Sequence, residues 1–194
     1  MTRFFLPLTA LAAAASVGLG TMPAQAHGMA AGGPLNGFLH PLLGADHLLM
    51  LLAVGTAASQ LSLQLLLWAL GGGVIGAFGS TGGWTLPLLE TLATLAIVAV
   101  AALTLAWNRR GSADRAIQWL TGGVVGAGVG IHGLLHGLEA PTDGRALLWW
   151  GGALLSSLVV CGGTAFVLRQ VPQTWRKALA LAMLMVGGVL VFAS

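Results

Sequence analysis

The chain has 194 residues, of which 57% are apolar and only 7% are charged, and its formal net charge is +3. A soluble domain carries about 25% charged residues, so this composition excludes a soluble globular protein and predicts an all-α, polytopic membrane protein. The small net charge, without any basic stripe, argues against a nucleic-acid partner, and the single cysteine, Cys161, excludes a disulfide framework and a thiolate zinc site.

Residues 1–26 have the pattern of a secretory signal peptide. Arg3 supplies the basic start, an apolar run covers 4–20, and an A-x-A cleavage site lies at 24–26. We therefore predict that the signal is cleaved and that His27 becomes the N-terminus, outside the cytoplasm of a bacterial cell. The alternative is an uncleaved first membrane helix.

The mature chain, residues 27–194, is predicted to be a single transmembrane domain. Six apolar segments follow a glycine-rich lead, and each is close to the ~20 residues that a spanning helix needs. Turn-forming residues separate them. We expect a bundle of six transmembrane helices with the approximate bounds 38–57, 61–79, 86–107, 117–137, 146–168 and 175–193.

The basic residues predict the orientation of this bundle. All but one of those after the signal lie in the loops 108–116 and 169–177, and the exception is Arg145. The positive-inside rule places both loops in the cytoplasm, so the mature N-terminus is periplasmic and the protein lies in the inner membrane. Tryptophans near the segment ends are expected to anchor the helices at the membrane interfaces: Trp84, Trp107, Trp119, Trp149, Trp150 and Trp175.

Glycines are concentrated in the second and fourth segments. Gly72 and Gly76 form one GxxxG pair, and Gly122, Gly126 and Gly130 form two more in series. Small residues at this spacing let helix backbones approach closely, so we predict tight helix packing there.

The first segment carries ionisable residues, which within a membrane usually face a polar path or a partner. Pro41 is predicted to occupy the first helical position, with His40 at the helix entrance. In a straight helix His40 and His47 lie ~10 Å apart, so they can bind one ion together only if the helix breaks near Gly44. In an unbroken helix they would be successive binding positions on an entry path for the ion. Asp46 is expected either to ligate directly or to orient His47.

The fourth segment carries the second group, His132, His136 and Glu139. The two histidines are four residues apart and share a helix face with the glutamate, which gives a half-site for a divalent metal. The predicted orientation brings both groups to the outer side of the membrane. His27, with its free amine, is a further chelating group or else a terminal residue without a role. Glu90 fits an interfacial position better than a ligand.

Other interpretations of these histidines remain. They could form a structural hydrogen-bond network, or Asp46 and His47 could relay protons in a proton-coupled carrier. Enzyme assignments fit poorly, because Gly133 stands where the HExxH motif needs glutamate and Ser80 lacks the motif of an intramembrane serine protease. We expect a protein that is not an enzyme.

The pattern His40-Pro41-x-x-Gly44-x-Asp46-His47, following a signal that ends before His-Gly, resembles the HupE/UreJ family of bacterial nickel and cobalt permeases. The later His132-Gly133-x-x-His136-Gly137-x-Glu139 is similar to the second histidine motif of that family. The resemblance implies that both motifs handle metal, and that the protein supplies Ni²⁺, or alternatively Co²⁺, for hydrogenase or urease maturation.

The expected function is therefore an inner-membrane permease for a divalent transition metal. His27 and His40 would capture the ion, and Asp46, His47 and His132, together with His136, would form the site beyond. The transported ion and the lipid bilayer are the expected partners, and homo-oligomers and cytoplasmic metal chaperones are compatible with the assignment. No prosthetic group is expected. The alternatives are a proton-coupled carrier of another small solute and a metal-binding accessory protein that does not transport.

Overall fold

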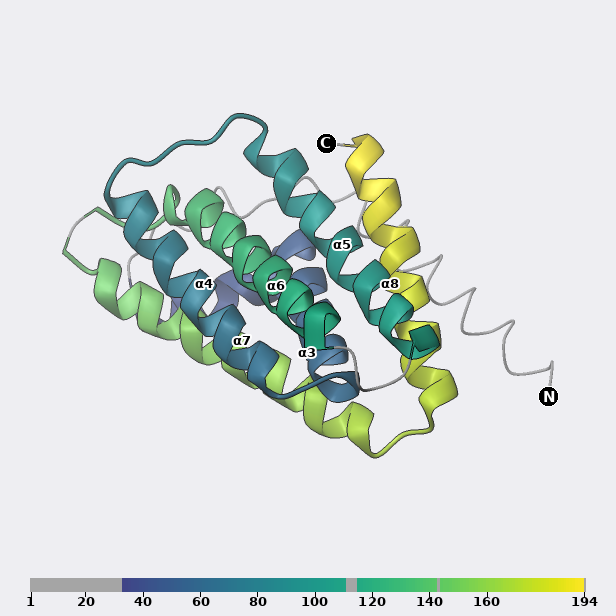
Figure 1. Cartoon of the computed structure of the whole chain (residues 1–194). Coiled ribbons are helices and arrows are strands. Elements are labelled where there is room, and N and C mark those ends of the chain that lie inside the picture. Colours follow the sequence, from purple (N-terminus) through teal and green to yellow (C-terminus); the bar gives the residue numbers. More distant parts are fainter. Residues whose placement is uncertain (1–32, 111–114, 143, 194) are drawn as a thin grey trace.

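A computed structural model describes residues 33–110, 115–142 and 144–193, and this part of the chain is all-helical. Its helices lie side by side in a bundle with short connections (Figure 1). The predicted all-α class is confirmed, whereas the signal peptide and His27 lie outside the described residues and stay predictions. The helices are α2 (Pro34–Leu43), α3 (Ala45–Gln60), α4 (Gln64–Thr81), α5 (Leu89–Arg110), α6 (Arg115–Gly137), α7 (Ala146–Arg169) and α8 (Gln173–Ala193).

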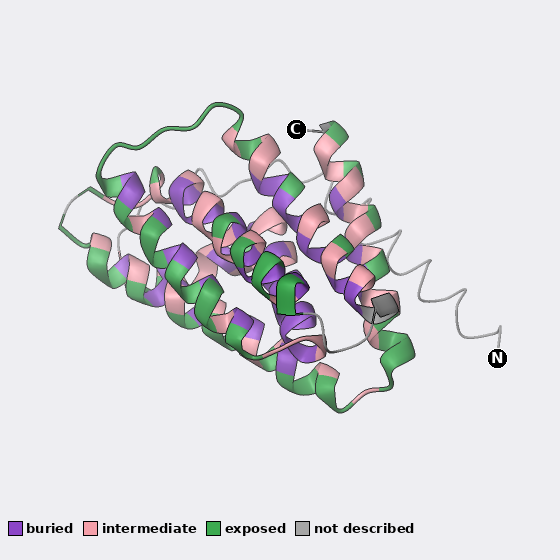
Figure 2. Cartoon of the chain, viewed as in Figure 1, coloured by how far each residue is buried: buried purple, intermediate pink, exposed green. Residues whose placement is uncertain are grey.

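Helix α3 is the centre of the bundle, because it contacts every other helix of the described chain. Its residues from Met50 to Ser59 are almost all buried, and Val54 and Ala57 have no exposed surface. A helix that is apolar all round is suited to such a position. The outward faces of the surrounding helices carry exposed apolar side chains (Figure 2), as expected of surfaces that meet lipid.

The number of membrane spans differs from the prediction of six. Four helices, α4, α5, α7 and α8, are long and apolar enough to cross a bilayer, and α2 with α3 makes a fifth candidate if the bent pair is one span. Helix α6 has 23 residues but is not among them. Its many glycines and two histidines lower its hydropathy, although it packs along α4 more extensively than any other helix pair.

The first predicted segment, 38–57, is not one continuous helix, because the chain breaks at Gly44, as the sequence requires if His40 and His47 are to share an ion. Helix α2 ends at Leu43, Gly44 is extended, and α3 leaves at 81° to α2. Pro41 is not the first helical residue as predicted: Pro34 takes that place, and Pro41 lies inside α2. The proline ring removes one backbone hydrogen bond there and weakens the helix shortly before its end. His40 therefore lies in the last turn of α2, not at a helix entrance.

The predicted glycine packing is confirmed between α4 and α6. A Cβ atom on Gly72 would overlap the carbonyl oxygen of Gly126, and one on Gly76 would overlap that of Gly130. The two helices begin at the same end of the bundle and run parallel, with their backbones in direct contact. This close approach holds the C-terminal end of α6, which carries both histidines of the second motif, in a fixed position.

The tryptophans divide into two groups. Trp84, Trp119 and Trp175 are exposed near helix ends, as interfacial anchors should be. Trp107 and Trp149 are buried, at 5% and 4% exposure, so these two do not fit the predicted role.

Candidate metal-binding site

The break at Gly44 brings together the two histidines that a straight helix would separate. The ring centroids of His40, in the last turn of α2, and His47, in the first turns of α3, lie 5.8 Å apart. The sequence required such a break for both to bind one ion, and the structure contains it. His40 therefore lies in the same group of histidines as His47, and its role in capturing the ion stays a prediction.

Helix α6 adds its two histidines to the same place. The ring of His136 lies 4.5 Å from His47 and 4.9 Å from His40, and the ring of His132 lies 5.5 Å from His47. Both residues of α6 are buried, with His132 only 1% exposed. The predicted convergence of the two motifs is thus present in the fold.

Three of these rings are spaced for a shared ion. One ligand nitrogen from each of His40, His47 and His136 lies within 4.8 Å of the other two. Nitrogens bound to a single ion at ~2.1 Å lie ~3.4 Å apart in a tetrahedral site, so small side-chain rotations would complete the coordination. Nitrogen atoms of all three rings are buried without a hydrogen-bond partner in the described chain, at His40 Nε2, His47 Nδ1 and His136 Nδ1. Buried polar atoms normally have partners, and a bound cation would supply one.

Asp46 connects the two motifs through its carboxylate. Its Oδ2 accepts a hydrogen bond from His136 Nε2 at 3.2 Å and lies 3.9 Å from His132 Nε2. Glu139 approaches the other side of His136, with its Oε1 3.8 Å from Nδ1. When the imidazoles are neutral, these two carboxylates give the cluster two negative charges. That charge matches a divalent cation and would be costly to bury without one.

His132 is oriented by the backbone of its own helix. Its Nδ1 lies 3.0 Å from the carbonyl oxygen of Gly128. A carbonyl only accepts hydrogen bonds, so Nδ1 carries the proton and Nε2 presents its lone pair towards Asp46 and His47. Holding the far nitrogen in this way is the usual means of fixing a histidine for metal binding.

The sequence did not indicate the contact that supports His40. The indole of Trp149, at the start of α7, lies 4.9 Å from the His40 ring. Helix α2 packs closely on α7 there, because Gly37 lies against the Trp149 carbonyl and Gly152 against the Pro34 carbonyl. The predicted glycine packing concerned the second and fourth segments, so nothing in the sequence identified α7 as the partner of α2.

The remaining predicted residues lie elsewhere. Glu90 is exposed in the first turn of α5 and does not contribute to the ring and carboxylate contacts above, in line with the interfacial role favoured by its position. His27 lies outside the described residues.

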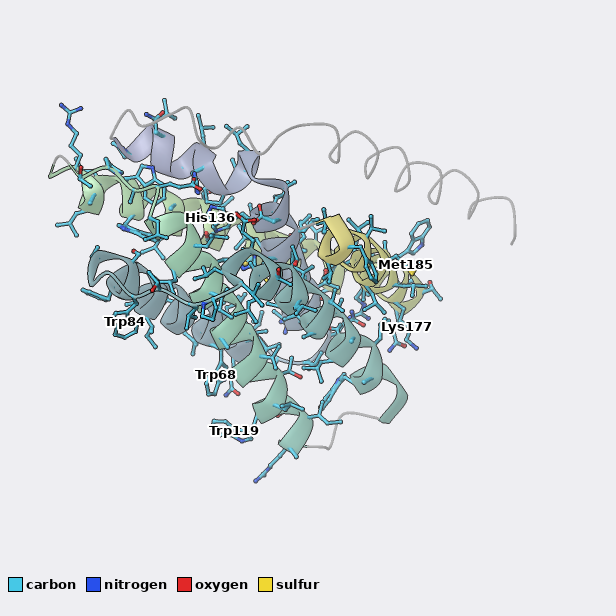
Figure 3. All side chains as sticks on the ribbon, turned by 90° about the horizontal axis from the view of Figure 1, so that it is seen from above. Trp68, Trp84, Trp119, His136, Lys177 and Met185 are labelled. Atoms are coloured by element: carbon cyan, nitrogen blue, oxygen red, sulfur yellow. The ribbon has the colours of Figure 1, made fainter. Side chains whose placement is uncertain are left out.

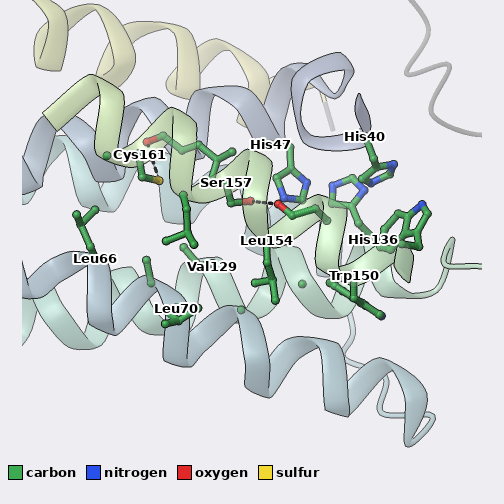
Figure 4. A pocket seen from close by; sticks show the side chains of 18 residues that line it. His40, His47, Leu66, Leu70, Val129, His136, Trp150, Leu154, Ser157 and Cys161 are labelled. Atoms are coloured by element: carbon green, nitrogen blue, oxygen red, sulfur yellow. Dashed lines mark hydrogen bonds between the residues drawn. The ribbon is translucent and has the colours of Figure 1, made fainter. Parts of the chain in front are cut away.

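A small cavity extends from the cluster towards the middle of the bundle. It has a volume of about 70 Å³, with His40, His47 and His136 at one end and Cys161 at the other (Figure 4). Between them the walls are mostly apolar. Ser157 donates to the Ala153 carbonyl and Cys161 to the Leu51 carbonyl, so the hydrogen-bonding groups of both side chains are already engaged.

Comparison with known proteins identifies the family. The family model described as HupE / UreJ protein matches residues 13–191. The chain is also similar to Protein HupE of Rhizobium leguminosarum bv. viciae, at 32% identity over 151 residues, which cover 72% of this chain and 73% of the relative. No solved structure matches. With a match over most of its length and several helices able to cross a bilayer, the chain is a multi-pass membrane protein that belongs to the HupE/UreJ family.

Proposed function

We propose that this protein is an inner-membrane permease that carries a divalent transition-metal ion, Ni²⁺ first and Co²⁺ as the alternative, from the periplasm to the cytoplasm. The observation that carries the proposal is the cluster at the broken helix. Four imidazoles and two carboxylates from α2, α3, α6 and the turn that follows α6 meet there, and three of the imidazoles are within reach of one ion. Membership of the HupE/UreJ family supports the same substrate class and a role in supplying hydrogenase or urease.

The ligand set fits this substrate class. Imidazole and carboxylate groups suit Ni²⁺, Co²⁺ and Zn²⁺, whereas Mg²⁺ and Ca²⁺ prefer oxygen ligands alone. His47 is the central ligand in this proposal, because its ring contacts His40, His132 and His136. The metal is the transported substrate and would be bound reversibly, so the absence of a thiolate from the cluster, which would hold such ions tightly, agrees with release.

The broken helix suits a transport site. Secondary transporters commonly place their ion sites at discontinuous helices, where backbone and side chains can rearrange without unfolding a whole span. Here α2 carries one ligand, α3 carries two, and the cavity beyond them leads inward between α3, α4, α6 and α7. In the proposed cycle the cluster binds the ion from outside, and the cavity must widen to let it pass.

The proposal is tested by metal uptake into cells that lack their own nickel transporter. Cells expressing the protein should accumulate Ni²⁺ or Co²⁺ above background, and a His47→Ala variant present in equal amount should not. Accumulation of Zn²⁺ or Cu²⁺ instead would show that the transported ion is not Ni²⁺ or Co²⁺. A folded His47→Ala variant with full uptake would refute the site. Metal binding by the purified protein without any uptake would favour the accessory-protein alternative.

The direction of transport has its own test. Reporter fusions at Gly111 and Gln173 should report the cytoplasm, and a fusion at Thr142 should report the periplasm. The opposite pattern would place the cluster on the cytoplasmic side and favour export.

A further inference from the structure

A polar cavity lies at the opposite end of the bundle from the histidines, where α4 and α6 both begin. Its volume is about 270 Å³. The polar groups that line it are a hydroxyl, two carboxamides and a guanidinium, and none of the described residues in its lining is acidic. These polar groups belong to Ser62, Gln64, Gln118 and Arg115.

This cavity opens into a long apolar groove on the membrane-facing side of the same two helices. The groove has a volume of about 870 Å³, and, unlike the cavity, it has no charged residue among its described lining residues. Gln64, Trp68 and Trp119 line both spaces, so the two are continuous. Trp68 and Trp119 meet edge to face at 5.7 Å where the polar part ends. Figure 3 shows Trp119, Trp68 and Trp84 following one another along this side of the molecule.

The groove owes its depth to glycines. The close contact between α4 and α6 leaves few side chains at the bottom of the groove. Gly71 and Gly123, which line it, have nothing within 4 Å of the position that a Cβ atom would take, so the space above them is open. The groove runs from the start of α4 to Trp84, which lies beyond the end of that helix. Helix α4 has 18 residues at ~1.5 Å each, so the groove is at least ~27 Å long. An acyl chain of one leaflet needs about half of a ~30 Å hydrocarbon core, so the groove can hold one along its full length.

We propose that this continuous cavity and groove bind an anionic phospholipid of the inner leaflet. The headgroup phosphate would lie beside the Arg115 guanidinium and the two carboxamides, and one acyl chain would lie in the groove over Gly123. Basic pockets between transmembrane helices on the cytoplasmic side are suited to anionic headgroups. Arg115 belongs to a loop that the positive-inside rule places in the cytoplasm, where such lipids are available.

The charge distribution favours a lipid over a second protein helix. The surface is polar and cationic at one end only and apolar over the rest, which is the pattern of a phospholipid. A helix from a second copy of the chain would fill the groove but would leave the Arg115 cavity without an anionic partner. The inference does not depend on metal transport, since the cavity and groove share no residue with the histidine cluster.

The test is native mass spectrometry of the purified full chain with phosphatidylglycerol or phosphatidylethanolamine of identical acyl chains. The wild-type protein should retain phosphatidylglycerol about fivefold more tightly. Arg115→Gln should abolish this preference, whereas Arg169→Gln, which changes an exposed arginine at the same predicted membrane face, should leave it intact. Equal retention of both lipids by the wild type, or equal effects of the two arginine variants, would overturn the proposal.

A second pair of variants tests the groove without changing charge. Gly123→Leu should weaken retention of both lipids at least about fivefold by filling the space for the acyl chain. Gly163→Leu, at an exposed and equally open position on α7, should have no effect. If Gly123→Leu instead removes a dimer seen with the wild type and leaves lipid retention unchanged, the groove binds a second copy of the chain and the lipid proposal is wrong.

Discussion

The two faces of α6 are held in position by different kinds of contact, hydrogen bonds of polar side chains on one face and close backbone packing on the other. One face presents His132 and His136 to α3, where their orientation depends on hydrogen bonds to Gly128 and Asp46. The other face presents glycines to α4, where Gly126 and Gly130 meet the backbone of that helix. At Gly72 and Gly76 of α4 this contact leaves no room for a Cβ atom, whereas the histidine face has unpartnered nitrogens suited to an ion. Changes on the first should affect folding, and changes on the second should affect function.

The largest effect is expected on the glycine face. Gly72→Ala places a methyl group against the Gly126 carbonyl and should force α4 and α6 apart, at the upper end of the ~1–3 kcal/mol typical of overpacking. The thermal unfolding temperature and the yield of monodisperse protein should both fall. Gly71→Ala is the control, since its methyl group meets open space. Equal stability of the two variants would mean that the seam is not a rigid contact.

The next effect concerns the link between the two motifs. Asp46→Ala removes the one carboxylate of the described chain that contacts both α6 histidines and should reduce uptake more than the ~10–100-fold seen when an outer partner of a metal ligand is lost. Asp46→Asn keeps the shape of the side chain but not its charge. This variant should retain the fold and lose nearly as much uptake as Asp46→Ala. If Asp46→Asn transports normally, the negative charge is not needed, and Asp46 only orients His136.

The third prediction concerns pH. A protonated imidazole cannot ligate a metal, so protons and metal compete for the cluster. An ordinary imidazole gains its proton near pH ~6.5, so lowering the external pH from 7.5 to 5.5 should raise the half-saturating metal concentration about tenfold for each histidine that must be neutral. The maximal rate at high metal should change little. Measurements with a protonophore present remove any contribution of the proton gradient, and a falling maximal rate under those conditions would contradict simple competition.

The smallest effect is expected at the tryptophan beside His40. Trp149→Leu removes the ring that packs on this histidine, and a lost aromatic contact of ~0.5–1.5 kcal/mol corresponds to about 2–10-fold weaker apparent affinity. Trp149→Phe, which keeps an aromatic ring beside His40, should recover most of the lost affinity. Trp175→Leu, at an exposed position on α8, serves as the control for loss of a tryptophan. A change in maximal rate without a change in affinity would show that Trp149 acts on a later step than binding.

The sequence by itself determined the helical class, the membrane setting, the two histidine motifs and the glycine seam. Each of these depends on residues close together in the chain: apolar runs long enough to span, His132 and His136 four residues apart, and glycines at GxxxG spacing. Such patterns fix which residues share a helix face before any tertiary contact forms. The family resemblance used the same local patterns.

Only the tertiary structure decided how these parts form one site. The sequence required a break near Gly44 for His40 and His47 to share an ion, but it could not show that the break exists, because Pro34 and Pro41 both fit the start of a helix. Nor could it show that Asp46 joins His136 across 90 positions of the chain, or that Trp149 covers His40. Long-range packing sets these contacts. The angle between α2 and α3 and the depth at which α6 meets them depend on every helix that packs around α3.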